Sequence, residues 1–179
     1  MAATEKKGRV SFEELAATIS RLRAPDGCPW DRAQTFDSLK PCMINEMTEA
    51  IAGIDLYHAT GKGDNLCEEL GDVLLQVLLL SEIAGEMGLF TIDDVIAGLN
   101  EKMIRRHPHV FGNASVPDAE NVLVKWEEIK KKEREREDPG EKARENAAFL
   151  SASEQVIEHL SKKRESMRTK EADEPPKIP

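Results

Sequence analysis

The segment from about Asn65 to Gly88 constrains the fold most, because its residues are apolar on nearly every side of a helix. A helix of this kind has to be covered by other elements, so it belongs in the core of a domain. Its most apolar run, VLLQVLLL, is far shorter than the roughly 20 residues needed to span a bilayer. We therefore expect a protein with no membrane partner, built around this helix.

The remaining sequence also favours helices. Apolar and polar residues nowhere alternate for long enough to predict a strand, and aromatic residues make up only 4% of the 179 residues. Capping residues and glycine or proline stops predict helices at about residues 12–24, 38–60, 64–88, 92–106, 119–137 and 141–168. We predict that four or five of these helices form an all-α bundle, in which the second and third helices form an antiparallel hairpin. The last helix is expected to form a charged extension.

Specific residues are expected to mark the helix ends. A capping box links Ser11 with Glu14, and Thr91 is paired with Asp94 in the same way. The other predicted caps are Ser38, with Pro41 in the first turn of its helix, then Asp64 or Asn65, and finally Asp118. The stretch APDGCPWDRAQTFD is predicted to be a loop, and EADEPPKIP is predicted to be a frayed tail.

Charge and cysteine content limit the class of protein. The formal net charge of −9 argues against a nucleic-acid partner and against binding to anionic membranes. The three cysteines form no CxxC pair, which is typical of reduced thiols in the cytosol. The first ten residues lack the apolar segment of a signal peptide. We therefore expect a cytoplasmic protein.

Two acidic pairs have the same three-residue spacing, Glu46 with Glu49 and Glu69 with Asp72. Residues three apart share a helix face, so an antiparallel hairpin can bring the two pairs together. Four neighbouring carboxylates repel one another unless they are protonated or bind a cation, and all-oxygen ligands favour a hard ion such as Mg²⁺. The alternative is that these acids lie on solvated helix faces, where such spacing is common.

A basic cluster lies in EKMIRRHPHVFG, residues 101–112. Lys102 and Arg106 are one helical turn apart and could hold phosphate oxygens together. The alternative is that they neutralise the C-terminal end of a helix. His107 and His109 flank a proline, and we favour a structural turn over a metal site for them.

Five motifs, in this order and spacing, resemble the MazG-type nucleoside triphosphate pyrophosphohydrolases: RLRAPDGCPWDRAQTFDSLKP, NEMTEA, EELGDVLLQV, KMIRRHPHVFG and VKWEEIKKKE. The resemblance extends over about residues 10–132. It implies a MazG-like domain at residues 10–137, followed by a charged helical extension at 138–179. It also implies Mg²⁺-dependent hydrolysis of a nucleoside triphosphate to monophosphate and pyrophosphate, with Mn²⁺ as an alternative ion. Family members are usually homodimers, so residues of two chains could complete one site.

The resemblance also assigns residues. The family's catalytic and metal-binding acids correspond to Glu46, Glu49, Glu69 and Asp72. Its triphosphate-binding residues correspond to Lys102, Arg106, Trp126 and Lys130, although from its charged surroundings alone Trp126 is expected to pack against protein.

The chain departs from the family pattern at two positions. The first glutamate of the EExxE motif is Asn45, and a lysine near the start of the third predicted helix is Asn65, with Lys62 close by but not at the matching position. Asn45 and Glu46 diverge by about 100° on a helix, so Asn45 is expected to lie beside the acidic face.

Alternative functions remain at this stage. Asn45 is compatible with a nucleotide-binding regulator whose hydrolysis is impaired. A related enzyme could act on another phosphoanhydride such as phosphoribosyl-ATP, although the RRHPHVFG and Trp126 region favours the MazG-like substrate class. A third alternative is a structural module that docks partners through its charged C-terminal helices. Base and sugar specificity cannot be read from these motifs.

Overall fold

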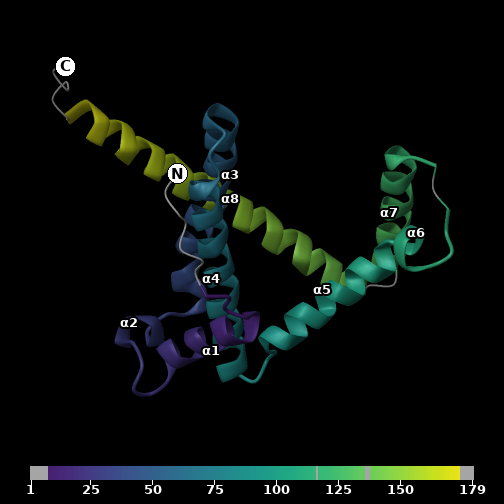
Figure 1. Ribbon diagram of the computed structural model, residues 1–179, viewed down its shortest axis with the longest axis horizontal. Coiled ribbons are helices and arrows are strands. Elements are labelled where there is room, and N and C mark those ends of the chain that lie inside the picture. Colours follow the sequence, from purple (N-terminus) through teal and green to yellow (C-terminus); the bar gives the residue numbers. More distant parts are fainter. Residues whose placement is uncertain (1–7, 116, 136–137, 174–179) are drawn as a thin grey trace. The chain divides into compact units, whose positions relative to one another are not determined.

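A computed structural model describes residues 8–115, 117–135 and 138–173, with side chains up to residue 170 (Figure 1). These residues form helices joined by turns and loops and contain no strand, so the predicted all-α class is confirmed. The chain divides into two compact units, residues 1–96 and 97–179. These units are defined by contacts between residues, whereas the domains expected at residues 10–137 and 138–179 rest on the family resemblance. The expected domains therefore remain predictions.

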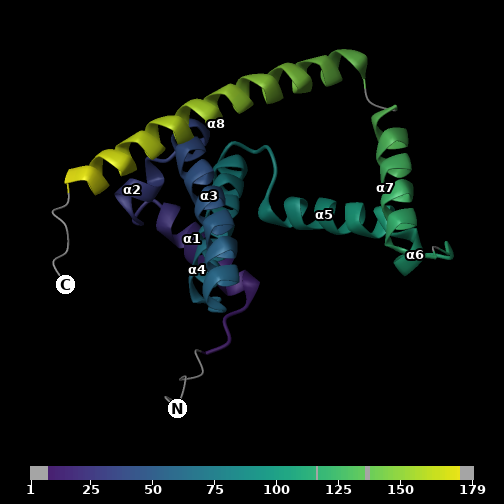
Figure 2. The ribbon, with the colours of Figure 1, turned by 90° about the horizontal axis from the view of Figure 1, so that it is seen from above.

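The first unit is built on a long helical hairpin. Its helices are α1 (Phe12–Arg23), α2 (Pro29–Arg32), α3 (Phe36–Thr60), α4 (Asp64–Glu86) and the start of α5 (Ile92–Arg106). Helices α3 and α4 lie side by side and run in opposite directions (Figures 1 and 2). Helix α1 packs against α4, and α2 packs against α1.

The hydrophobic core of this unit lies at one end of the hairpin. It consists of Ile19 from α1, Leu39 from the start of α3, and Leu78, Leu79 and Ile83 from the second half of α4. Burial of these side chains removes apolar surface from water and stabilises this end. Along both helices, the predicted acidic pairs lie between this core and the turn of the hairpin.

Two of the predicted capping pairs are confirmed. The backbone N–H of Ser11 donates to Glu14 Oε2 at 2.7 Å, and the N–H of Glu14 donates to Ser11 Oγ at 3.2 Å. Thr91 and Asp94 make the same exchange at 2.8 and 3.4 Å. These bonds satisfy N–H groups that lack a partner within the helix. Helix α3 stops at Gly61, as predicted. Gly61 has a φ of 71°, a conformation that favours glycine.

The predicted N-caps of the two hairpin helices were wrong. Thr35, and not Ser38, is the N-cap of α3; Ser38 is its third residue and exchanges hydrogen bonds with Thr35 at 2.9 and 3.2 Å. Pro41 therefore lies inside α3 rather than in its first turn. Helix α4 begins at Asp64 after Gly63 and has no side-chain cap. Asn65 does not cap it, because its amide binds another side chain further along the helix.

Two short helices occur where none was predicted. Helix α2 interrupts the predicted loop, and α6 (Pro108–Phe111) follows α5 directly. Each begins with proline, whose fixed φ suits the first helical position. Four residues are too few to show a periodic pattern of apolar side chains, so neither helix could be recognised from hydrophobic spacing.

The second unit continues from α5 through α6 to two further helices. Helix α7 (Ala119–Arg134) has Asp118 as its N-cap, as predicted, with Oδ1 accepting from the N–H of Asn121 at 2.9 Å. It ends at Arg134, earlier than predicted. Helix α8 (Pro139–Asp173) is longer than the predicted 141–168 and includes the first residues of the predicted tail, the rest of which is outside the described residues. No described helix is both long enough and apolar enough to cross a membrane.

A buried arginine ties three segments of the first unit together. The Arg23 side chain is 5% exposed, and its Nε and Nη2 donate to the two carboxylate oxygens of Glu86, each at 2.7 Å. Its Nη1 donates to the backbone carbonyls of Asp31 and Gln34. The hydrogen bonds from Arg23 lower the pKa of the Glu86 carboxyl group. Arg23 thus joins the end of α1, the α2 region and the end of α4.

Gly53 lies where α3 closely approaches the start of α4. A Cβ atom at this position would lie 3.1 Å from the Leu66 Cα atom and 3.1 Å from Asn65 Oδ1. Only a residue without a side chain leaves these contacts undisturbed. Gly53 therefore allows the two helices to pack closely next to the acidic residues.

Replacing Gly53 by leucine is expected to lower the free energy of unfolding by about 2 kcal/mol, because overpacking forces the helices apart. Urea denaturation measures this. Gly98→Leu in α5 is the matched control, because nothing lies within 4 Å of a Cβ at that position. The control should be neutral or slightly stabilising, since leucine is the better helix former. Equal losses in the two variants would contradict the assigned contact.

Candidate functional site

Three carboxylates from the two hairpin helices gather at one place. Glu46 and Glu49 on α3 and Glu69 on α4 each place one carboxylate oxygen within 4.8 Å of the others. Glu46 and Glu69 are half-buried, and Glu49 is exposed. We refer to these three residues as the glutamate cluster.

The hairpin register explains why these residues meet. Gly53 faces Leu66 across the helix pair. One turn back along α3 is Glu49, and one turn forward along α4 is Glu69, so antiparallel helices place these two opposite each other. Glu46 lies one further turn back on the same face of α3. The cluster therefore follows from the acidic spacing combined with the close contact at Gly53.

Asp72 lies outside this set. It is half-buried on α4, one turn beyond Glu69. Neither of its carboxylate oxygens lies within 4.8 Å of all three grouped glutamate oxygens. Its side chain is one methylene shorter than that of glutamate, so it reaches less far from the helix. The assignment of Asp72 as a fourth ligand therefore remains a prediction.

The donor set suits a hard divalent cation. Oxygens bound to one Mg²⁺ ion lie up to about 4.2 Å apart, since each Mg–O distance is about 2.1 Å. The carboxylate oxygens, within 4.8 Å of one another, need only small side-chain rotations to reach that spacing. Carboxylates also suit Mn²⁺, whereas the cluster has no thiolate or imidazole that would favour a softer metal.

Asn65 orients one of the three carboxylates. Its Nδ2 atom donates a hydrogen bond to Glu69 Oε1 at 2.9 Å, and both side chains are partly buried. Groups that hydrogen-bond to a ligand carboxylate fix its orientation. From the sequence, Asn65 was expected as a possible helix cap and as a departure from a family lysine. Its i, i+4 spacing from Glu69 is the signal that could have revealed this contact.

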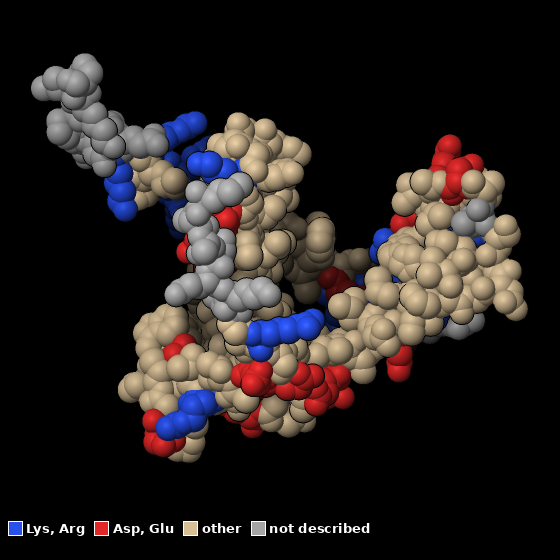
Figure 3. Space-filling model, viewed as in Figure 1, with Lys and Arg blue, Asp and Glu red and all other residues tan. Residues whose placement is uncertain are grey.

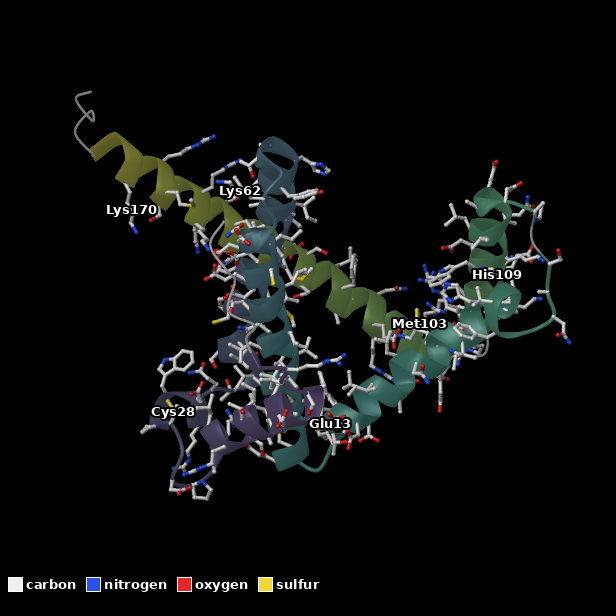
Figure 4. All side chains as sticks on the ribbon, in the orientation of Figure 1. Glu13, Cys28, Lys62, Met103, His109 and Lys170 are labelled. Atoms are coloured by element: carbon white, nitrogen blue, oxygen red, sulfur yellow. The ribbon has the colours of Figure 1, made fainter. Side chains whose placement is uncertain are left out.

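The other departure, Asn45, lies on α3 beside Glu46 and is half-buried. The glutamate cluster forms from three acids without a carboxylate at position 45. Lys62 lies in the turn between α3 and α4 (Figure 4), where it is exposed.

In the second unit, the structure brings together two of the predicted substrate-binding residues. The Arg106 guanidinium lies 5.5 Å from the centre of the Trp126 ring. Its Nε and Nη2 donate to Glu133 Oε2 at 3.1 and 2.7 Å, and Arg105 Nε donates to Glu133 Oε1 at 2.6 Å. Arg105 belongs to the basic cluster expected from the sequence, which assigned it no role, and Glu133 was not identified from the sequence.

The remaining predicted substrate-binding residues lie outside this contact set. Lys102 is exposed on α5, one turn before Arg106. Lys130 is partly buried on α7 and its Nζ lies 3.4 Å from Glu127 Oε1 on the same helix. Lys102 and Lys130 therefore remain predicted, and not observed, partners of an anion.

The two histidines pack within the second unit. His107 Nδ1 lies 2.6 Å from the Met103 carbonyl oxygen, so that nitrogen carries the proton and donates. The His107 ring contacts Trp126 edge-on at 4.8 Å between ring centres and lies 5.6 Å from the His109 ring. Figure 4 shows His109 near α6 and Met103 on α5. These contacts support a structural role for the histidines.

Comparison with known proteins places these residues in a family. Residues 34–111, which include the whole glutamate cluster and Arg106, match the model of the MazG nucleotide pyrophosphohydrolase domain. The chain is 51% identical over 130 residues to a protein of Thermotoga maritima named "Nucleoside triphosphate pyrophosphohydrolase/pyrophosphatase MazG", covering 72% of this chain and 48% of that protein.

Two other relatives show similar coverage. The "Nucleoside triphosphate pyrophosphohydrolase" of Escherichia coli (strain K12) is 40% identical over 124 residues, which are 69% of this chain and 46% of that protein. "Uncharacterized protein YabN" of Bacillus subtilis is 52% identical over 123 residues, 69% of this chain and 24% of that protein. The chain thus spans about half or less of these relatives. The chain therefore contains a MazG nucleotide pyrophosphohydrolase domain, which residues 34–111 match.

Proposed function

We propose that the protein hydrolyses nucleoside triphosphates to nucleoside monophosphate and pyrophosphate with the help of Mg²⁺, for which Mn²⁺ can substitute. The observation that carries this proposal is the glutamate cluster, which lies inside the matched domain. Glu46, Glu49 and Glu69 would hold the ion, with Asp72 as a fourth ligand. All four acids would be catalytic, because they hold the reacting groups in place.

A bound Mg²⁺ would neutralise phosphate charge and make a bound water more acidic. The protein's own residues position the reaction. Asn65 holds Glu69 in orientation. Lys102, Arg106 and Lys130 would hold phosphate oxygens, and Trp126 would support Arg106 or stack on the base.

The proposed reaction is an attack by water on the α-phosphorus. A bond forms between the water oxygen and that phosphorus, and the bond from it to the α–β bridging oxygen breaks. The electron pair leaves with pyrophosphate. A carboxylate of the glutamate cluster accepts the proton from water, since the amide of Asn45 cannot act as a base.

A substrate panel tests this function. Ribonucleoside and deoxyribonucleoside triphosphates, and phosphoribosyl-ATP, are incubated with and without Mg²⁺ or Mn²⁺, and both products are quantified. We expect equal amounts of monophosphate and pyrophosphate, only with metal. Absence of metal-dependent pyrophosphate release from every compound would refute the proposal, and release from phosphoribosyl-ATP alone would redirect it to that substrate.

We also propose that the protein acts as a homodimer through the hairpin. Several large apolar side chains are exposed on α3 and α4: Met47 at 48%, Ile51 at 58%, Ile54 at 44% and Leu70 at 55%. Figure 3 shows that much of the hairpin surface visible there carries residues other than Lys, Arg, Asp and Glu. Exposed apolar surface of this kind commonly marks a protein interface. These residues alternate with the glutamate cluster along the helices, so a second copy could help to enclose the site.

Replacing Ile51 by glutamate is expected to convert the dimer into a monomer, because a charge buried at an interface is costly. Sedimentation equilibrium measures the mass. Leu99→Glu is the matched control, since Leu99 is 54% exposed on α5 and is not on the hairpin. A monomeric wild-type protein, or an Ile51→Glu variant that stays dimeric, would contradict this interface.

The cytoplasm is the proposed location. The three cysteines, Cys28, Cys42 and Cys67, all carry free thiols. Free thiols are typical of reducing compartments. Fractionation of cells that produce the native protein tests the location.

A further inference from the structure

One carboxylate on α7 binds two consecutive arginines on α5. Side chains of neighbouring helical residues leave the helix about 100° apart, so Arg105 and Arg106 would ordinarily point in different directions. Both nevertheless hydrogen-bond to Glu133, with distances of 2.6 Å for Arg105 and 2.7 and 3.1 Å for Arg106. Glu133 therefore draws the two guanidinium groups to the same point.

The contact with Glu133 leaves other N–H groups of the two arginines available to bind a further anion. Glu133 engages Arg106 through Nε and Nη2 and Arg105 through Nε. Arg106 Nη1 and both Nη atoms of Arg105 take no part in it. The Arg106 side chain is 17% exposed and that of Arg105 is 54% exposed, so the pair is anchored at one side and open to solvent at the other.

Trp126 restrains Arg106 from a second direction. Its ring lies 5.5 Å from the guanidinium carbon and is itself held by the edge contact with His107. An arginine held by both a carboxylate and an aromatic ring loses little further freedom when it binds an anion, which favours binding.

The charge balance also permits anion binding. Hydrogen bonds from Arg106, and then from Arg105, lower the pKa of Glu133 to about 2. Glu133 is thus ionised throughout the neutral range, and two arginines with one carboxylate keep a net charge of +1. The ionised Glu133 also stabilises the folded protein above the ordinary glutamate pKa of 4.5, and this stabilisation is lost as the pH falls towards 2.

We propose that Glu133 is a positioning residue that assembles Arg105 and Arg106 into a paired site for the phosphate groups of the substrate. This inference rests on the proposed function, because the anion is taken to be the triphosphate. It adds Arg105 to the predicted substrate-binding residues and gives Glu133 a role that its own negative charge would not suggest.

The test compares Glu133→Gln with Glu128→Gln, a matched change in an exposed carboxylate on the same helix. Because the two released arginine side chains would have to be ordered again on binding, we expect the KM for the triphosphate to rise about tenfold or more. The kcat should change less than about twofold, since the metal ligands are untouched. Glu128→Gln should leave both constants unchanged.

Calorimetric titration with inorganic tripolyphosphate, without metal, separates this inference from the proposed function. A wild-type protein that releases no pyrophosphate refutes the proposed function, but the titration still tests Glu133. We expect weaker binding by Glu133→Gln and intermediate binding by Glu133→Asp, which keeps the charge and also serves if the glutamine variant does not fold. Equal or tighter binding by either variant would overturn the inference, because it would show that Glu133 does not help the arginines or competes with the anion.

Discussion

Replacing Glu69 by glutamine is expected to lower metal-dependent pyrophosphate release by about 10²–10³-fold. The amide keeps the shape of the side chain and can still accept the hydrogen bond from Asn65 Nδ2. It loses the charge that binds a divalent cation. The melting temperature should stay the same or rise without metal, since one of three neighbouring carboxylates no longer repels the others.

The matched control for this variant is Glu68→Gln. Glu68 is the preceding residue of α4, is exposed and is not part of the glutamate cluster. Steady-state assays over a range of Mg²⁺ concentrations should give wild-type activity for the control. Wild-type activity in Glu69→Gln as well would remove the glutamate cluster from the mechanism.

Replacing Arg23 by methionine is expected to lower the free energy of unfolding by about 2–4 kcal/mol. The variant leaves the backbone carbonyls of Asp31 and Gln34 without their donor. Glu86 is 48% exposed, so water can solvate its carboxylate and limit the loss. Guanidinium denaturation followed by circular dichroism measures the change.

Arg21→Met is the control for this effect. Arg21, which is also in α1, forms an ion pair with Asp26, which follows this helix. The Arg21 side chain is 59% exposed and that of Asp26 is 78% exposed. Exposed pairs contribute about 0–1 kcal/mol, so the control should be nearly as stable as the wild type. Equal losses in both variants would show that burial of Arg23 does not matter.

The stabilisation by Arg23 should also depend on pH. Because the pKa of Glu86 is lowered in the folded protein, the ion pair stabilises above the ordinary glutamate pKa and weakens as the pH falls through the lowered value. The difference in stability between wild type and Arg23→Met should therefore shrink in acid.

The fold class could be predicted because the information is local. Capping residues such as Ser11 and Asp118 act on N–H groups within three residues, and the stop at Gly61 depends on its own φ. The start of α3 was missed because Thr35 and Ser38 are both good capping residues, and their reciprocal bonds place Thr35 at the cap. The role of Arg23 was missed because its partner is 63 residues away.

The sequence could predict part of the grouping of acidic residues, because that part follows from local helical spacing. Helical spacing placed Glu46 and Glu49 on one face, and the hairpin brings Glu69 to them. Spacing alone could not show that Asp72 stays outside this group, since the outcome depends on side-chain reach and rotation. The bonds from Arg105 and Arg106 to Glu133 cross 28 and 27 residues, and no periodic pattern encodes such a contact.

The most direct test of the central claim is hydrolysis of a nucleoside triphosphate in water enriched in ¹⁸O, with Mg²⁺ present and the products analysed by mass spectrometry. We predict that one ¹⁸O atom enters the nucleoside monophosphate and none enters pyrophosphate, because water attacks the α-phosphorus held at the glutamate cluster. Label in pyrophosphate would place the attack on the β-phosphorus and contradict this mechanism. Failure to form either product in the presence of Mg²⁺ would contradict the function itself.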